Sequence, residues 1–136
     1  MPSALQRFWE KLYVSDSGCW LWLAAKNEHG YGVFRAGGRQ WKAHRWAYVH
    51  ILGKDAEGMD MDHLCRRRGC VNPSHLEAVP HRENCVRGDG WSGVNARKTH
   101  CPAGHEYDDA NAYVDKKGQR HCRTCRRRRM RAYREV

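Results

Sequence analysis

Two groups of cysteine and histidine residues, each at the spacing of metal ligands, constrain this chain more than any other feature. The first group lies in Cys65-x4-Cys70-x4-His75, and the second is Cys101-x3-His105 followed by Cys122-x2-Cys125. Close Cys/His pairs separated by a loop are typical of structural zinc sites, which take four ligands in a closed tetrahedron. The sequence therefore predicts a small fold held together by two zinc ions.

The composition agrees with a fold that needs such ions. Only 40% of the 136 residues are apolar, so the chain is one ordinary domain, or a small domain with an appendage, without a large autonomous core. The odd count of seven cysteines, with histidines at ligand spacing, favours zinc in a reducing compartment over a disulfide framework. No signal peptide and no membrane-spanning run is evident, which predicts a cytoplasmic protein without a membrane partner.

The fourth ligand of the first zinc has two candidates, Cys19 and Cys85. We favour Cys19, because a ligand from the first strand would tie the N-terminal part of the chain to the central loop. Cys85 lies beside Asn84, and a ligand role there would draw that residue toward the zinc. In the second group, His100 and His121 compete with His105, which has the better spacing.

The elements expected between these ligands are short and of both kinds. Ser3 and Gln6 have capping-box spacing and open a helix that we expect to run to about Tyr13. The remaining expectations are a strand at residues 19–23, a hairpin of residues 31–35 and 40–43 turning at Gly37-Gly38, a helix at 44–52, strands at 60–64 and 76–79, and a helix from Pro80 to about Arg87. The predicted fold class is α+β.

The chain divides into three parts by composition. Residues 1–88 form the first predicted domain, with an N-terminal helix and β-hairpin before a strand–strand–helix unit. Residues 89–99 are rich in turn-forming residues and are predicted to be a linker. Residues 100–136 form a zinc finger followed by a basic helix, and zinc would supply most of the folding free energy of this part.

The central stretch resembles a known family of nucleases. His63-Leu64-Cys65, Cys70-Val71-Asn72-Pro73-Ser74-His75-Leu76 and Glu83-Asn84 are similar to the HNH, or ββα-metal, endonucleases. The resemblance is closest to the His-Cys box homing endonucleases and to small phage HNH proteins, and it covers roughly residues 19 to 130. It implies a ββα-metal (His-Me finger) core, a DNA-hydrolysing activity, and a DNA-associated protein of a bacterium or phage-infected host cell.

The chemistry of such an enzyme is consistent with the residue types present. A neutral imidazole accepts a proton from water near neutral pH, so His63 is the expected general base. Asn84 and Asp62 are the expected ligands of one catalytic Mg²⁺ (or Mn²⁺), which would act as a Lewis acid on the scissile phosphate. Adjacent strand residues point to opposite faces, however, so Asp62 joins His63 in one site only if the strand ends or bulges there.

One position departs from the family pattern. His75 occupies the place where many HNH proteins have a central Asn, and here its spacing from Cys70 favours zinc. If His75 binds zinc, backbone carbonyls must orient His63, and Asn72 becomes a turn residue. Arg45 is the candidate for holding the scissile phosphate, because a guanidinium fits phosphate oxygens. His44 and Arg82 are weaker candidates, and His81 is expected to be an exposed helix residue.

The charge of the chain predicts a polyanionic partner. Its formal net charge is +10 and its isoelectric point about 9.6, and residues 122–134 contain seven arginines and no acid. Double-stranded DNA is the expected partner. The candidate contacts are Arg35, Arg39 and Lys42 on the hairpin, Arg66 and Arg67 in the first zinc loop, and Arg126, Arg127 and Arg129 on the C-terminal helix.

Two other functions compete with the nuclease. One is a non-catalytic, zinc-dependent DNA-binding protein on the same scaffold, which would need neither His63 nor Asn84. The other is an RNA-binding zinc protein, which ranks last because the six tryptophans fall mostly at core-like positions and leave no stacking surface. The sequence leaves open a monomer that nicks DNA and a homodimer that cuts both strands.

Overall fold

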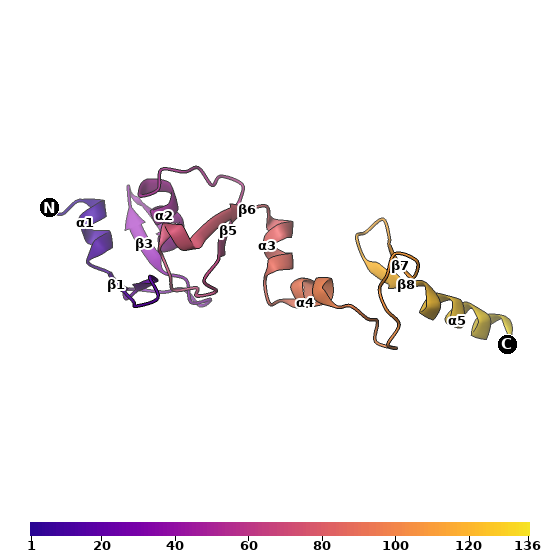
Figure 1. Ribbon diagram of the computed structural model, residues 1–136. Helices are drawn as coiled ribbons and strands as arrows, with labels where there is room; N and C mark the ends of the chain where they lie inside the picture. Colours follow the sequence, from indigo (N-terminus) through magenta and orange to yellow (C-terminus); the bar gives the residue numbers. More distant parts are fainter. The chain divides into compact units, whose positions relative to one another are not determined.

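A computed structural model describes residues 1–136, which fold as two compact units. Unit 1 comprises Met1–Cys85 and unit 2 comprises Val86–Val136 (Figure 1). Both contain short helices and two-stranded antiparallel sheets, so the α+β class predicted from the sequence is confirmed. None of the helices is both long and apolar enough to cross a membrane.

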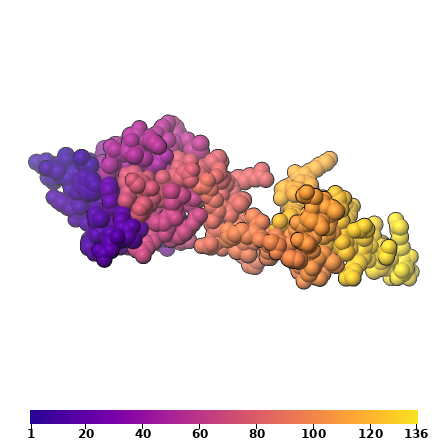
Figure 2. All heavy atoms as spheres, in the orientation of Figure 1, coloured from indigo at the N-terminus to yellow at the C-terminus, as the bar shows by residue number.

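Unit 1 is built from three antiparallel strand pairs and the helices between them. In chain order its elements are α1 (Ala4–Trp9), β1 (Leu12–Val14), β2 (Trp20–Trp22), β3 (Val33–Ala36), β4 (Arg39–Lys42), α2 (Ala43–His50), β5 (Asp60–His63), a 3-10 turn η1 (Pro73–His75), β6 (Leu76–Val79) and α3 (His81–Arg87), whose last two residues belong to unit 2. The strands pair as β1–β2, β3–β4 and β5–β6. In the space-filling view the atoms of this unit form one contiguous, packed body (Figure 2).

The first helix ends earlier than the sequence predicts. The Ser3–Gln6 capping box forms as expected, but α1 stops at Trp9 instead of continuing to Tyr13. Leu12–Val14 is extended and pairs with Trp20–Trp22, in the register Leu12↔Trp22. Pairing with β2 satisfies backbone groups that a longer helix would have used, and this tertiary contact overrides the local helical pattern.

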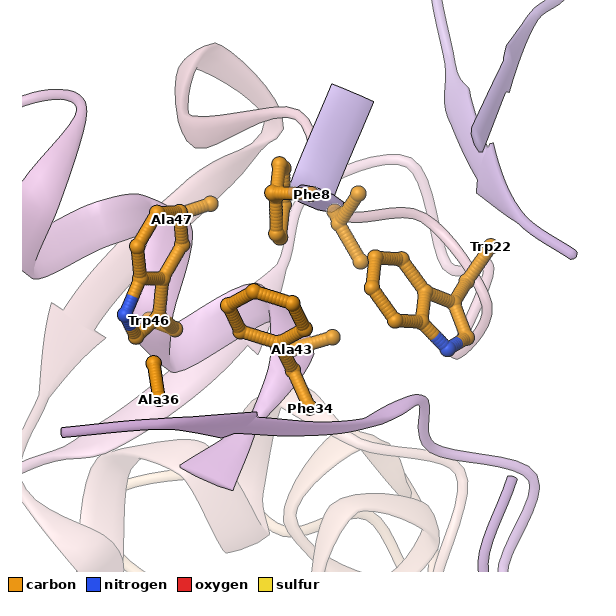
Figure 3. Packing of buried hydrophobic residues seen from close by; sticks show 8 residues of the cluster. Phe8, Trp22, Phe34, Ala36, Ala43, Trp46 and Ala47 are labelled. Atoms are coloured by element: carbon orange, nitrogen blue, oxygen red, sulfur yellow. The ribbon is translucent and has the colours of Figure 1, made fainter. Parts of the chain in front are cut away.

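An aromatic cluster forms the core of unit 1. The rings of Phe8, Trp22, Phe34 and Trp46 contact one another, with Phe8 and Trp46 centroids 4.8 Å apart (Figure 3). Gly32 is needed beside this cluster, because a Cβ there would lie 2.6 Å from Cδ1 of Trp22. Aromatic pairs of this kind contribute about 0.5–1.5 kcal/mol each beyond the burial of their area.

Unit 2 contains one short helix before the finger. Its elements are α4 (Trp91–Arg97), the strand pair β7 (Ala112–Val114) and β8 (Arg120–Cys122), and α5 (Arg123–Arg134). Helix α4 lies within the segment that the sequence presents as a linker, so that segment is structured. Arg120 donates hydrogen bonds to the carbonyls of Asn95 and Lys98 and thereby joins the end of α4 to the finger.

Candidate active site and metal centres

Four potential zinc ligands meet in unit 1. The ligand atoms of Cys19, Cys65, Cys70 and His75 all lie within 4.8 Å of one another, and His75 Nδ1 is 3.5 Å from Cys19 Sγ. Cys19 precedes β2, whereas the other three lie between β5 and β6. Cys85, the alternative fourth ligand, instead has its Sγ 3.5 Å from His81 Nε2.

Backbone pairing brings these distant ligands together. Trp22 donates from its backbone N–H to the carbonyl of Gly69, and Val71 donates to the carbonyl of Trp20, at 2.9 and 2.8 Å. Burial raises the pKa of the Cys70 thiol to about 12, so a thiolate at this position requires a cation beside it. Three thiols and one imidazole in a closed cluster fit a structural zinc.

A second cluster of the same composition lies in unit 2. The ligand atoms of Cys101, His105, Cys122 and Cys125 are within 4.8 Å of one another. The first pair sits on a tight turn, in which Gly104 has a φ of +85° and donates to the carbonyl of Cys101. This set also fits a structural zinc. The two competing histidines bind elsewhere, His100 with Thr99 and His121 with Asp115, at 2.8 Å each.

His63 is the last residue of β5 and is buried. Its Nε2 lies 3.0 Å from the carbonyl oxygen of Cys70, in the first zinc loop. A carbonyl can only accept a hydrogen bond, so Nε2 carries the proton and Nδ1 is the basic nitrogen of a neutral ring. Burial lowers the pKa of His63, which keeps the imidazole neutral at pH 7.

The ring of His63 packs against two other side chains. The His44 ring centroid lies 4.8 Å away and that of Tyr31 lies 5.9 Å away. His44 is itself 3% exposed, and its Nδ1 is buried without a hydrogen-bond partner. Burial, with His63 and two cationic neighbours, lowers the pKa of His44 to about 3. The sequence identified His44 only as a weak phosphate contact, whereas its ring forms one wall around His63.

Asp62 is buried beside His63 in the chain. Its Oδ1 accepts a hydrogen bond at 2.8 Å from Nη1 of Arg66, which carries a positive φ of 58° in the following turn. The pairing of β5 is regular up to its end, with Asp62 opposite Glu77 and His63 opposite Leu76. Successive side chains of a strand leave opposite faces, but β5 ends at His63, which is the condition under which Asp62 and His63 can serve one site.

Asn84, on α3, contacts Asp60. Its Nδ2 donates to Asp60 Oδ2 at 3.1 Å, and the same oxygen lies 2.7 Å from Nδ1 of His81. Hydrogen bonding from His81 lowers the pKa of the Asp60 carboxyl. Sequence reasoning missed Asp60. Its two-residue spacing from Asp62, which places both carboxylates on one face of a strand, is the signal that could have identified it.

Two other predicted residues are engaged with the backbone. Arg45 donates from Nη1 to the carbonyl of Met59 at 2.9 Å and from Nη2 to the carbonyl of Ala56, so its guanidinium holds the loop before β5. Two of the five guanidinium donors are used in this way, and the contact of Arg45 with the scissile phosphate stays a prediction. Asn72 donates to the carbonyl of Gly18 and caps η1 through Ser74, as a turn residue.

The candidate DNA contacts lie at the surfaces of both units. Arg35, Arg39 and Lys42 are exposed on the β3–β4 hairpin, where the Arg39 guanidinium stacks 3.7 Å from the Trp41 ring centroid. Helix α5 buries none of its residues, so Arg126, Arg127 and Arg129 are open to solvent. Exposed cationic side chains of this density attract a polyanion.

Comparison with known proteins identifies similar sequences in phages. Residues 42–86, which span both β5 and β6, match the HNH endonuclease family. The chain is 30% identical over 84 residues to the uncharacterized gene 5.3 protein of enterobacteria phage T3, covering 57% of this chain and 83% of that protein. It is also 30% identical over 82 residues to protein 2.8 of Escherichia phage T7, covering 58% of this chain and 55% of that protein. No solved structure matches the chain.

Proposed function

Because this chain belongs to the HNH endonuclease family, we propose that it is a metal-dependent endonuclease that hydrolyses phosphodiester bonds in double-stranded DNA. The observation that carries the proposal is the hydrogen bond between His63 Nε2 and the Cys70 carbonyl. It defines one basic nitrogen on a buried, neutral imidazole.

In this proposal His63 is the general base. Its Nδ1 removes a proton from the attacking water, and the positive charge that develops on the ring is stabilised by the Cys70 carbonyl at Nε2. General-base catalysis of this kind contributes about 10²- to 10⁴-fold to a rate. The walls formed by His44 and Tyr31 restrict the ring to one orientation, which reduces the entropy lost in the transition state.

Asp62 and Asn84 are the proposed ligands of a catalytic Mg²⁺ or Mn²⁺. Asn84 uses its Nδ2 for the hydrogen bond to Asp60, so its carbonyl oxygen remains available to a hard cation. Asp62 would provide a carboxylate oxygen once the metal replaces Arg66 as its partner. Such an ion supplies Lewis-acid stabilisation of the phosphate and the leaving oxygen. Asp60 is then a positioning residue for Asn84.

The two zinc clusters are proposed to be structural, and the basic surfaces to bind DNA. The first zinc would hold the loop that contains the Cys70 carbonyl, and therefore the partner of His63. The hairpin arginines, Arg66 and Arg67, and the arginines of α5 are the proposed phosphate contacts. Their number predicts binding that weakens steeply with salt.

A plasmid cleavage assay with the full chain tests this proposal. With Mg²⁺ the protein should convert supercoiled DNA to nicked or linear form, and His63→Ala should lower the rate at least about 100-fold. DNA binding in EDTA-free buffer without Mg²⁺ should be retained by this variant. His29→Ala removes an exposed imidazole in unit 1 and serves as the matched control. Equal cleavage by His63→Ala and the wild type would exclude His63 as the base.

Variants of the metal ligands separate positioning from ligation. Asn84→Ala should abolish cleavage, whereas Asn84→Asp keeps an oxygen ligand and should retain part of the activity with Mn²⁺. Asp60→Asn should lower the rate with a smaller loss than Asn84→Ala, because it changes only the partner of the amide. Cleavage by Asn84→Ala at the wild-type rate would remove this residue from the metal site.

The alternative is a zinc-dependent DNA-binding protein that does not cut. The four-ligand clusters and the exposed α5 support it, because neither feature requires catalysis. Wild-type protein that shifts duplex DNA in a native gel, but leaves plasmid intact with Mg²⁺ and with Mn²⁺, would favour this function over the nuclease.

A further inference from the structure

A cleft in unit 2 has no role in the proposed cleavage reaction. It has a volume of about 780 Å³, within the range of about 300–1,000 Å³ that small-ligand sites occupy. Its walls combine aromatic rings with guanidinium groups, and it also borders Asp115 and three cysteines of the second Cys/His cluster, Cys101, Cys122 and Cys125. The side chains that the following argument uses are Tyr107, Tyr113, His121, Arg120, Arg126 and Arg129.

The aromatic rings of the cleft are organised by stacking. The Tyr113 and His121 rings stack with centroids 5.2 Å apart and an interplanar angle of 24°. The Arg120 guanidinium covers the Tyr107 ring, with Cζ 4.2 Å from its centroid. Arg126 donates a hydrogen bond to the Tyr113 hydroxyl at 3.1 Å. The Arg123 and Arg126 guanidinium groups also lie over the Tyr113 ring, at 5.0 and 5.6 Å from its centroid. The cleft therefore presents layered ring and guanidinium planes rather than bare tyrosine faces.

Helix α5 contributes one face to this cleft. Arg126, Arg129 and Met130 border it, and their spacing of three and four residues places them on the same side of the helix. Met130 is 51% exposed, so it offers an apolar side chain at the cleft alongside the two arginines. Arg127 and Arg128 do not border the cleft and provide an internal comparison.

This combination matches an unpaired nucleotide better than a duplex. Flat rings and guanidinium planes stack on base faces, which are accessible only when a base is unpaired and unstacked. In a duplex the base faces are covered, and a protein reaches only groove edges and phosphates. Arginines at the rim of a stacking site are placed to contact the phosphates on either side of the base.

We propose that the finger cleft binds unpaired nucleotides of single-stranded DNA. The bases stack against the layered ring and guanidinium planes at Tyr107 and Tyr113 and beside Met130, and Arg126 and Arg129 contact the flanking phosphates. This site lies wholly within unit 2 and requires neither Mg²⁺ nor cleavage. If the proposed nuclease function also holds, duplexes carrying an unpaired segment are its favoured substrates.

Binding of a fluorescent oligothymidylate to the full chain, with zinc present and Mg²⁺ absent, tests the cleft. Two double variants remove the same charge from the same helix: Arg126→Gln with Arg129→Gln at the cleft, and Arg127→Gln with Arg128→Gln away from it. Both should weaken duplex binding to a similar degree. The cleft variant should weaken oligothymidylate binding at least tenfold more than the other. Equal losses for the two variants would show a simple charge effect and overturn the site.

A stacking variant completes the test. Tyr113→Leu keeps an apolar side chain without a π face, and it should weaken oligothymidylate binding several-fold while zinc content stays at the wild-type value. Loss of zinc would point to a folding defect, and the comparison of the two arginine double variants would then decide whether the cleft binds the oligonucleotide. An RNA oligonucleotide of matching sequence that binds more tightly than the DNA would overturn the assignment to DNA.

The outcome is independent of the nuclease proposal. The binding measurements can be repeated on His63→Ala protein, which lacks the proposed base but retains unit 2. Weak oligothymidylate binding with normal plasmid cleavage would reject the cleft alone. Tight, cleft-dependent binding without any cleavage would reject the nuclease alone.

Discussion

Phe8, Trp22, Phe34 and Trp46 meet in unit 1, whereas no comparable cluster of buried rings forms in unit 2. In unit 2 the buried apolar side chains are Cys101 and Cys122, both of which belong to the second Cys/His cluster. The two units are nevertheless built from similar pieces, namely short strand pairs and a four-ligand Cys/His cluster.

The difference indicates what a zinc ion contributes in each unit. In unit 1 the first cluster joins the β2 region to the loop after β5, and the aromatic core supplies independent stability. In unit 2 the second cluster takes the place of a core, so the proposed zinc binding would make metal binding and folding one event. The variants below test this comparison, beginning with the largest expected effect.

Loss of the second zinc should unfold unit 2. Cys125→Ser removes one ligand, and structural zinc contributes about 10–16 kcal/mol to the folding of small finger domains. Zinc content should fall from two ions per chain to one, and amide hydrogen exchange should lose protection across residues 100–125. Cys85→Ser, a cysteine outside both clusters, should keep two ions and normal protection. Retained protection in Cys125→Ser would contradict the comparison.

Truncation of the aromatic core should affect unit 1 alone. Phe8→Ala removes a fully buried ring and should lower the unfolding free energy of unit 1 by about 3–5 kcal/mol. Denaturant titration followed by tryptophan fluorescence measures this loss. Leu5→Ala, on an exposed position of the same helix, should change stability by about 0.5 kcal/mol or less. A loss of hydrogen-exchange protection in unit 2 would show that its stability depends on the core of unit 1.

Acid should destabilise unit 1 through His44. The folded pKa of about 3 lies below the ordinary value of 6.5, so the unfolded chain binds more protons, and stability present above pH 6.5 is lost as pH falls toward 3. At pH 5 the protonation of His44 in the unfolded chain should lower the free energy of unfolding of unit 1 by about 2 kcal/mol. His44→Phe should flatten the pH dependence between pH 7 and 5, whereas His29→Gln, on the surface, should leave it unchanged. Denaturant midpoints at each pH provide the measurement, and parallel curves for wild type and His44→Phe would contradict the burial argument.

The smallest effect is expected at the start of α1. Ser3 accepts from the backbone of Gln6, and the Gln6 side chain accepts from the backbone of Ser3. Ser3→Ala removes the first of these bonds and should destabilise unit 1 by about 1 kcal/mol. Thermal unfolding detects a change of this size, and Ser3→Asp should restore most of it. If Ser3→Ala has no effect, α1 is held by Phe8 packing alone.

Local patterns predicted many elements correctly. The hairpin at Gly37-Gly38, the strands around Asp60–His63 and Leu76–Val79, and the helix after Pro80 are all present near their predicted bounds. These signals are turn residues and alternation within a few positions, which act within the element itself. The end of α1 and the helix α4 were not predicted. The end of α1 is decided by the pairing of β1 with β2. Helix α4 is held by hydrogen bonds from Arg97 and Arg120, whose partners lie 9 to 25 residues away in the sequence.

The candidate site follows the same division. Ligand spacing within the two Cys/His groups identified side chains that the structure brings together, and Cys19 rather than Cys85 is the fourth member of the first cluster. The contacts of Asn84 with Asp60, and of Arg45 with the loop before β5, depend on how separate elements pack. No local pattern contains that information.

By itself, the sequence determined which residues have the chemistry for zinc binding, proton transfer and contact with DNA, because residue type and close spacing are local properties. Only the tertiary structure decided how these residues are oriented. It placed the Cys70 carbonyl on Nε2 of His63, buried His44 against the same ring, and gathered Tyr107, Tyr113 and His121 around one cleft. The physical reason is that hydrogen bonding and burial at each of these positions come from contacts between separate elements, which the fold brings together and no local pattern contains.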